Sequence, residues 1–186
     1  MMPIILDPSG LKIALVGKGP RAVARLELLR SHGAAPHAIF CPEPDDDLAQ
    51  AAGDTLVARW PSEGDLAVAD IVFAAGLEDE EADRLRTRAR RAKALLNVED
   101  VRSHCDFHVP ATVRRGDLLL TVSTGGASPG LARRIAKRLG ALFGPQWSEH
   151  LAELAQLRAG WRAAGMDVAA LARETDRHID QKGWLS

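Results

Sequence analysis

The chain has 186 residues, 46% of them hydrophobic, and its 24 Lys and Arg side chains nearly balance 25 Asp and Glu, for a formal net charge of -1. A chain of this length can bury a real core and suits one main domain with an appendage. Because the charges nearly cancel, no field over the whole chain attracts nucleic acid or anionic lipid, and no nucleic-acid or membrane partner is expected.

The apolar runs and the cysteines indicate the cytoplasm. No apolar run approaches the roughly 20 residues that span a bilayer, and residues 1–10 lack the charged-then-apolar pattern of a signal peptide. The two cysteines, Cys41 and Cys105, are far apart and form no Cys-x-x-Cys pair. They are expected to be free thiols in a reducing compartment, so we expect a cytoplasmic protein.

The first half of the chain alternates predicted strands with predicted helices. Short apolar runs predict strands at 12–16, 36–40, 55–60, 70–75 and 94–98. Helical spacing predicts helices over 21–32 and 77–92, with Gly33 closing the first as a C-cap. This alternation is typical of a doubly wound parallel sheet with right-handed crossovers. We therefore expect a Rossmann-like α/β domain that binds a dinucleotide over residues 1–106.

The pattern changes after the fifth predicted strand. Residues 111–113 and 118–123 flank Arg114-Arg115-Gly116-Asp117, which is typical of a hairpin turn. This segment does not fit a strand-helix-strand unit. We expect a β-hairpin followed by a helix over residues 107–143.

The last part of the chain is expected to be helical from Ser128 onward. Gly144-Pro145 should break one helix, and Gly160 and Gly165 mark candidate turns between further helices. We expect a small helical C-terminal region over residues 144–186.

A glycine-rich segment follows the first predicted strand and opens the first predicted helix. It fits the pattern G-x-G-x-x-A in the context that a dinucleotide fingerprint requires. The first glycine permits a tight turn, the second lets the backbone approach a pyrophosphate, and the helix N-terminus favours the negative charge. A glycine turn without a ligand is the alternative. The candidate cofactor-binding residues here are Gly17, Lys18, Gly19, Pro20, Arg21 and Ala22.

Further candidates for cofactor binding stand where predicted strands end. No acidic residue ends the second strand, so Glu43 is the candidate for the ribose hydroxyls. The ends of the fourth and fifth strands supply Ala74, Ala75, Gly76, Asn97 and Val98. These residues do not decide between NAD and NADP.

Asp100 lies just past a predicted strand, where the ligands of open α/β sheets bind. A carboxylate there could accept a proton during catalysis. It could instead cap the turn over 101–104, and Asn97 is expected to hold the same turn through its amide. Glu99 places a second carboxylate beside it, which either interacts with Asp100 or points away.

A second glycine loop ends the predicted hairpin. Ser123-Thr124-Gly125-Gly126 precedes Ser128-Pro129, which predicts a helix start with Ser128 as N-cap. The loop could receive a substrate carboxylate, or it could be a capped turn without a ligand. Arginine suits carboxylate binding, although most of the basic residues nearby should form a solvated face. The candidate substrate-binding residues are Thr124, Gly125, Gly126, Ser128, Arg115 and Arg133.

Four potential metal ligands cluster at His104, Cys105, Asp106 and His108. A zinc-type site needs three or four converging ligands, and the rest of the chain offers no obvious fourth. Chance clustering is the better interpretation, so no resident metal site is predicted.

Three segments in one order carry a family resemblance. Asn97-Val98-Glu99-Asp100, Cys105-Asp106-Phe107 with Pro110-Ala111, and the Ser123 to Pro129 loop match N-V-x-D, C-D-F-x-x-P-A and S-T-G-G-x-S-P. The run resembles the dehydrogenase/ferrochelatase family of siroheme synthesis. The resemblance implies NAD-dependent oxidation of precorrin-2 to sirohydrochlorin for siroheme or cobalamin, with Asp100 as general base. In many members of that family, ferrous iron is a further substrate.

The resemblance also implies a homodimer formed through the hairpin and the helix that follows it. The chain departs from the family pattern at Lys18, Gly76, Glu99, Ala136 and Gly140. Two alternatives therefore remain open. One is a non-catalytic NAD-binding sensor or regulatory module on the same fold, and the other is a chelatase alone.

Overall fold

The structure is a computed structural model that describes residues 2–185. Its internal contacts divide the chain after Val109 into two compact units. The first unit contains the expected sheet, and the second contains both the hairpin and the C-terminal helices. Within the described residues, no helix is long and apolar enough to cross a membrane.

The first unit is built on a parallel sheet of five strands in the order β3-β2-β1-β4-β5. The strands are β1 (Ile13–Gly17), β2 (Ala38–Phe40), β3 (Leu56–Val57), β4 (Ile71–Ala75) and β5 (Leu95–Val98). The strand order reverses between β1 and β4, and such switch points are where open α/β sheets bind ligands. The expected Rossmann-like fold is therefore confirmed.

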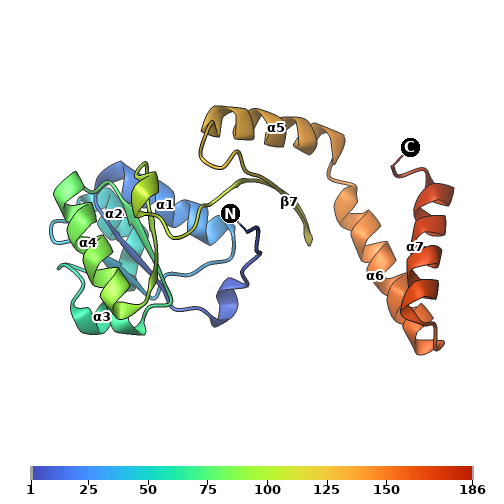
Figure 1. Cartoon of the computed structure of the whole chain (residues 1–186), viewed down its shortest axis with the longest axis horizontal. Helices are drawn as coiled ribbons and strands as arrows, with labels where there is room; N and C mark the ends of the chain where they lie inside the picture. The colour runs from blue at the N-terminus through green and yellow to red at the C-terminus, as the bar shows by residue number, and fades with distance from the viewer. Residues whose placement is uncertain (1, 186) are drawn as a thin grey trace. The chain divides into compact units, whose positions relative to one another are not determined.

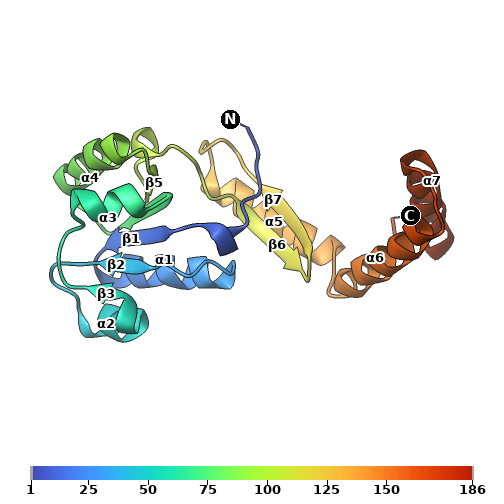
Figure 2. The same cartoon turned by 90° about the horizontal axis from the view of Figure 1, so that it is seen from below.

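Helices cover both faces of this sheet (Figures 1 and 2). The four helices are α1 (Gly19–Ser31), α2 (Asp46–Ala52), α3 (Glu63–Val68) and α4 (Asp79–Ala92), with short 3-10 turns at Pro8–Gly10, Gly53–Thr55 and Arg102–His104. One core packs α1 and α2 on the sheet through Leu26 and Leu48, and the other packs α3 and α4 through Leu66 and Leu85. All four leucines are buried.

Two helices and one strand boundary differ from the sequence-based expectation. Helices α2 and α3 were not expected, because each is short and its main signal is its cap. The carboxylate of Asp45 accepts from the Leu48 N–H at 2.8 Å, and Ser62 forms a capping box with Asp65. The strand expected over 55–60 covers only Leu56–Val57, since the chain turns where the Arg59 N–H bonds to the Val57 carbonyl.

The second unit packs one helix on a two-stranded antiparallel sheet. Strands β6 (Ala111–Arg115) and β7 (Leu118–Val122) form the expected hairpin. Helix α5 (Pro129–Leu142) lies against it, and Val113, Ala132 and Ala136 are buried (Figure 2). The hairpin is confirmed with the turn at Gly116, whose φ is +57°.

The C-terminal helices form an antiparallel pair. Helix α6 (Trp147–Ala163) begins after the predicted break at Gly144-Pro145, and α7 (Val168–Lys182) follows the predicted turn at Gly165. The predicted turn at Gly160 is wrong, because α6 continues through it. The pair is joined by aromatic contacts, in which the His150 ring stacks on Trp184 with centroids 4.1 Å apart.

Candidate functional site

The turn from β1 into α1 contains two glycines with different roles. A Cβ on Gly17 would lie 2.3 Å from the Ala75 carbonyl oxygen, so only glycine fits between the two strands. Gly19 has φ +63°, and a Cβ there would meet nothing within 4 Å. Gly17 therefore serves packing within the fold, while the space above Gly19 is open to a ligand.

The first turn of α1 has no side-chain cap. Lys18 is the N-cap residue, but its side chain makes no capping hydrogen bond, and Pro20 has no N–H to donate. The N–H groups of this turn and the positive end of the helix dipole therefore face the open space. This arrangement fits a pyrophosphate, and with Gly19 it gives the site the features of a dinucleotide cradle.

Lys18 connects the glycine turn to α4. Its Nζ lies 3.0 Å from the Glu81 carboxylate and 3.9 Å from that of Glu78. The hydrogen bond to Glu81 raises the pKa of Lys18. The predicted contact of Lys18 with a phosphate would therefore have to compete with Glu81.

The structure explains why glycine stands at position 76, where the chain departs from the family pattern. Its φ is +69°, and a Cβ would lie 2.3 Å from the Lys18 carbonyl oxygen. A side chain at this position would collide with the backbone of the glycine turn. In this chain, glycine is what allows the end of β4 to pass the phosphate loop.

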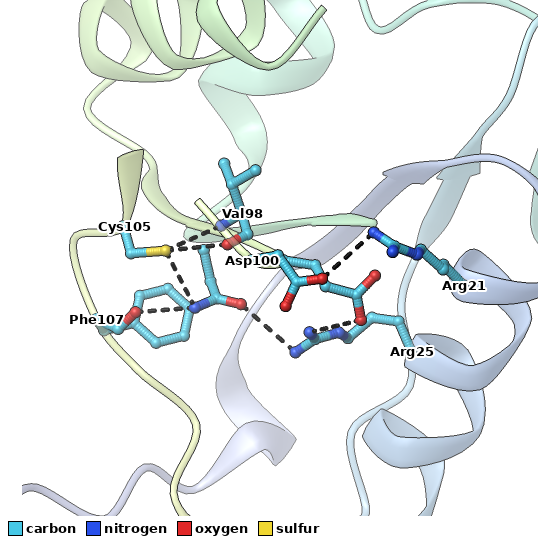
Figure 3. Close-up of polar contacts among 8 residues, drawn as sticks. Arg21, Arg25, Val98, Asp100, Cys105 and Phe107 are labelled. Carbon is cyan, nitrogen blue, oxygen red and sulfur yellow. Dashed lines mark hydrogen bonds and ion pairs between the residues drawn. The ribbon is translucent and has the colours of Figure 1, made fainter. Parts of the chain in front are cut away.

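Asp100 lies in a tight turn beyond β5 (Figure 3). The turn is closed by the Val101 N–H, which donates to the Val98 carbonyl at 3.4 Å. Asp100 itself has φ +61°, a left-handed conformation that Asp tolerates better than most residues. Its side chain is 75% exposed and lies 3.3 Å from Arg21 Nη1. The 3-10 turn that follows begins without a side-chain cap, so Asp100 does not cap it.

The turn over residues 98–101, which we call the acid turn, and the glycine turn over residues 17–19, which we call the phosphate loop, are both anchored to β4. They bond to neighbouring carbonyls of that strand. The Glu99 N–H donates to the Ala74 carbonyl at 2.9 Å, and the Lys18 N–H donates to the Ala75 carbonyl at 3.2 Å. The side chains of Ala74, Ala75 and Val98 are buried. These residues therefore support the two segments from below.

The amide of Asn97 is fully engaged within the protein. Its Nδ2 donates to the Phe107 carbonyl at 2.9 Å, and its Oδ1 accepts from Arg25 Nη1 at 3.4 Å. Cys105 binds the same strand end, because its thiol donates to the Val98 carbonyl at 3.1 Å and accepts from the Val98 N–H. Burial raises the pKa of the Cys105 thiol. Both residues brace the acid turn (Figure 3).

Arg25 is a site residue that the sequence patterns missed. It lies in the middle of α1, and its side-chain hydrogen bonds are with Asn97 and Glu99, more than 70 positions later in the chain. No local motif signals such a pair. The helical spacing of Arg21 and Arg25, one turn apart, is the feature from which it could have been inferred.

Glu43, the candidate for the ribose hydroxyls, is exposed beyond the end of β2. Three further carboxylates follow it at the start of α2, on Asp45, Asp46 and Asp47. Cys41, just before it, is buried, and burial raises the pKa of its thiol. The segment that follows the carboxyl end of β2 is therefore strongly acidic.

The glycine loop of the second unit closes largely on itself. The Thr124 hydroxyl accepts from the Ser128 N–H at 3.1 Å and donates to the Ser128 carbonyl at 3.0 Å. Ser128 caps α5 by accepting from the Leu131 N–H, and the Gly125 N–H donates to the Ser123 hydroxyl. Within residues 2–185 the Gly126 N–H has no acceptor. The loop thus has the geometry of a capped turn, and the Gly126 N–H is available to a ligand.

The two candidate arginines of this unit differ in availability. The Arg115 guanidinium donates to the carbonyls of Phe143, Gly140 and Arg114 at 2.9, 2.9 and 2.8 Å. It therefore joins the hairpin to the C-terminal end of α5. A Cβ on Gly140 would lie 3.5 Å from Arg115 Nη2, which is an ordinary van der Waals distance, so this contact does not require glycine. Arg133 is exposed on α5 and forms no ion pair within the described part of the chain.

The potential metal ligands around Cys105 point to separate partners. His104 Nε2 lies 3.1 Å from an Asp83 carboxylate oxygen, and the Asp106 carboxylate accepts from the Leu96 N–H at 2.9 Å. Among residues 2–185, no three His, Cys, Asp or Glu side chains come together as a metal site would require.

The chain matches a family model described as "Putative NAD(P)-binding" over residues 4–111. It is 32% identical over 157 residues to the siroheme synthase of Nitrosococcus oceani, covering 83% of this chain and 33% of that protein. It is 34% identical over 152 residues to the siroheme synthase of Methylococcus capsulatus, covering 74% of this chain and 30% of that protein. The chain thus spans about a third of the length of these relatives.

A solved structure described as "SirC, precorrin-2 dehydrogenase" has a similar fold. The TM-score is 0.76 at 22% sequence identity, and the match covers 100% of this chain and 93% of that one. The likeness extends over both units, including the hairpin and the C-terminal helices. At this level of identity, it supports the fold.

Proposed function

Because the chain belongs to the siroheme synthase N-terminal domain-like family of NAD(P)-binding proteins, we propose that it is a precorrin-2 dehydrogenase that uses NAD. The reaction removes a hydride and a proton from the tetrapyrrole and yields sirohydrochlorin. The dinucleotide, when bound, supplies the hydride acceptor. The chain has to bind that cofactor, orient the substrate and accept the proton.

One observation carries this proposal. The backbone N–H of Glu99, next to the exposed Asp100 carboxylate, and that of Lys18, in the uncapped glycine turn, donate to consecutive carbonyls, those of Ala74 and Ala75, at the end of β4. A cofactor cradled at the glycine turn after β1 would therefore have a proton acceptor held at the end of β5, on the other side of β4. This is the pair of functions that an oxidation by hydride removal needs.

In the proposed reaction, the Asp100 carboxylate accepts the proton released as the substrate carbon is oxidised. Its exposure leaves it accessible to a large substrate, and Arg21 holds it by an ion pair. The first-turn N–H groups of α1 and the backbone at Gly19 would hold the pyrophosphate. In the second unit we propose Arg133 and the Gly126 N–H as ligands of substrate carboxylates.

The direct test follows the absorbance of precorrin-2, generated without oxygen, when it is mixed with the purified protein with and without NAD. Formation of sirohydrochlorin only with NAD supports the dehydrogenase. Ferrous iron is then added. Insertion of iron into sirohydrochlorin faster than in a control without protein would show chelatase activity as well. No conversion by folded protein that still binds NAD would favour the non-catalytic sensor. Metal insertion without any dinucleotide would favour the chelatase alone.

We propose NAD rather than NADP as the cofactor because of the acidic segment that follows β2. The carboxylates of Glu43, Asp45, Asp46 and Asp47 lie beyond Phe40, where the ribose of a dinucleotide is bound in this fold. The extra phosphate of NADP carries negative charge and would be repelled there. A nearby guanidinium, that of Arg59, is paired with Asp65 at 2.6 Å and is thus already engaged.

The expected result is that NAD binds at least about tenfold more tightly than NADP, a difference of about 1.4 kcal/mol. Glu43→Gln should narrow this difference in affinity, because it should weaken the binding of NAD and strengthen the binding of NADP. Glu27→Gln, which removes an exposed carboxylate from α1, is the matched control. Calorimetric titration measures all three proteins, and equal or tighter binding of NADP to the wild type would contradict the preference.

We also propose that the protein is a homodimer formed through the second unit. Leu131, Ile135 and Leu142 are exposed on α5 and lie at helical spacing, so they form one apolar stripe. Ile135→Asp should shift the protein from dimer to monomer in analytical ultracentrifugation. Ala141→Asp adds the same charge outside the stripe and should leave the dimer intact. A wild type that is monomeric at micromolar concentration would argue against the dimer.

A further inference from the structure

Two arginines on successive turns of α1 face the two carboxylates of the turn after β5. Arg21 Nη1 lies 3.3 Å from Asp100 Oδ2, and Arg25 Nη2 lies 3.4 Å from Glu99 Oε1. The Arg25 side chain is only 11% exposed, whereas that of Arg21 is 63% exposed. Helix α1 therefore holds the acid turn by one mostly buried pair and one exposed pair (Figure 3).

The buried pair holds Glu99 on the inner side of the turn. Glu99 Oε2 is buried and has no hydrogen-bond partner within residues 2–185. The Arg25 guanidinium also donates to Asn97 Oδ1 at 3.4 Å and lies 5.8 Å from the centre of the Phe73 ring. Without Arg25, the Glu99 carboxylate, whose side chain is only 24% exposed, would lose its ion pair, which is unfavourable. It would be forced to turn toward water.

That movement would reach Asp100 through the backbone. The two residues are adjacent in one tight turn, and Asp100 keeps a left-handed conformation that few residues adopt without support. An outward Glu99 would compete with Asp100 for the exposed side of the turn. The orientation of one carboxylate therefore depends on where the other is held.

We propose that Arg25 is a positioning residue for Asp100. By holding Glu99 against α1, it keeps the turn over 98–101 in the conformation that presents the Asp100 carboxylate. The inference rests on the proposed function, in which Asp100 accepts a proton. Because the role of Arg25 acts through its pair with Glu99, the requirement for Arg25 should exist only when Glu99 is present.

A double-mutant cycle tests this dependence. Arg25→Leu should lower kcat by roughly tenfold to a hundredfold, because a catalytic group moved by about 1 Å loses activity on that scale. The dissociation constant for NAD should stay within about twofold of wild type. Glu99→Leu alone should keep near-normal kcat, and Arg25→Leu combined with Glu99→Leu should recover it.

If Arg25→Leu lowered kcat equally in the wild-type and Glu99→Leu backgrounds, Arg25 would have a purely structural role. That result would overturn the inference. A large loss from Glu99→Leu alone would do the same, since it would make Glu99 itself the required group. Arg30→Leu removes a positive charge from the exposed side of the same helix and is the matched control. It should leave kcat unchanged.

Hydrogen exchange gives a readout that does not depend on activity. The Glu99 and Val101 amides, bonded to the carbonyls of Ala74 and Val98, should exchange faster in Arg25→Leu and recover in the double variant. Unchanged exchange in Arg25→Leu would overturn the positioning role. A wild type without dehydrogenase activity that shows the expected exchange pattern would instead refute the proposed function and leave the support of the turn by Arg25 standing.

Discussion

Asp100→Asn is expected to lower the turnover of precorrin-2 by about a hundredfold or more while leaving the affinity for NAD unchanged. The amide cannot accept the proton that the carboxylate takes in the proposed reaction. Asparagine is the suitable replacement because it adopts a left-handed conformation readily, and Asp100 has φ +61°. The turn should therefore keep its shape, so that the variant tests chemistry rather than folding.

The measurement combines single-turnover kinetics of precorrin-2 oxidation with calorimetric titration of NAD. Asp176→Asn removes an exposed carboxylate from α7 and serves as the control. It should behave as wild type in both measurements. Wild-type turnover by Asp100→Asn would refute the proposed proton acceptor. A parallel loss of NAD affinity would place Asp100 in binding instead.

Gly19→Val is expected to reduce the affinity for NAD by about a hundredfold or more, with the fold retained. Gly19 has φ +63°, and a Cβ there would project into the open space above the loop. That is the space through which a pyrophosphate would approach the backbone. The left-handed conformation adds a strain of about 1–2 kcal/mol for a residue such as valine, so the free energy of unfolding should fall modestly.

Gly33→Val is the matched control for that strain. Gly33 follows the other end of α1, has φ +76°, and likewise would meet nothing within 4 Å as a Cβ. The free energy of unfolding, measured by urea denaturation, should fall by a similar amount in both variants. Only Gly19→Val should also lose affinity for NAD. NAD affinity lowered equally by the two would mean that strain, and not access to the loop, decides binding.

Local sequence patterns determined much of the first unit. Strands β1 and β4 are short runs buried on both faces, and the glycine turn between β1 and α1 follows from its spacing. The order of strands and helices was enough to predict the Rossmann-like sheet. Short elements such as α2 and α3 escaped, because a cap at Asp45 or Ser62 is a weaker signal than a long apolar period.

Sequence also placed Asp100 at a strand end, but it did not reveal what surrounds the carboxylate. The pairs with Arg21 and Arg25 form only because α1 packs beside the end of β5 across the reversal in strand order. The residues are separated by more than 70 positions in the chain. Pairing at that distance is set by the crossovers, which no local period records.

The glycine loop of the second unit shows the same division. From the sequence, the Thr124 hydroxyl and the Arg115 guanidinium were candidates for binding a substrate. The folded chain directs them to the backbone of Ser128 and to the C-terminal end of α5. Residue type fixes which hydrogen bonds a side chain can make, and that much the sequence by itself determined. Which partners those bonds reach depends on how distant segments pack, and only the tertiary structure decided it.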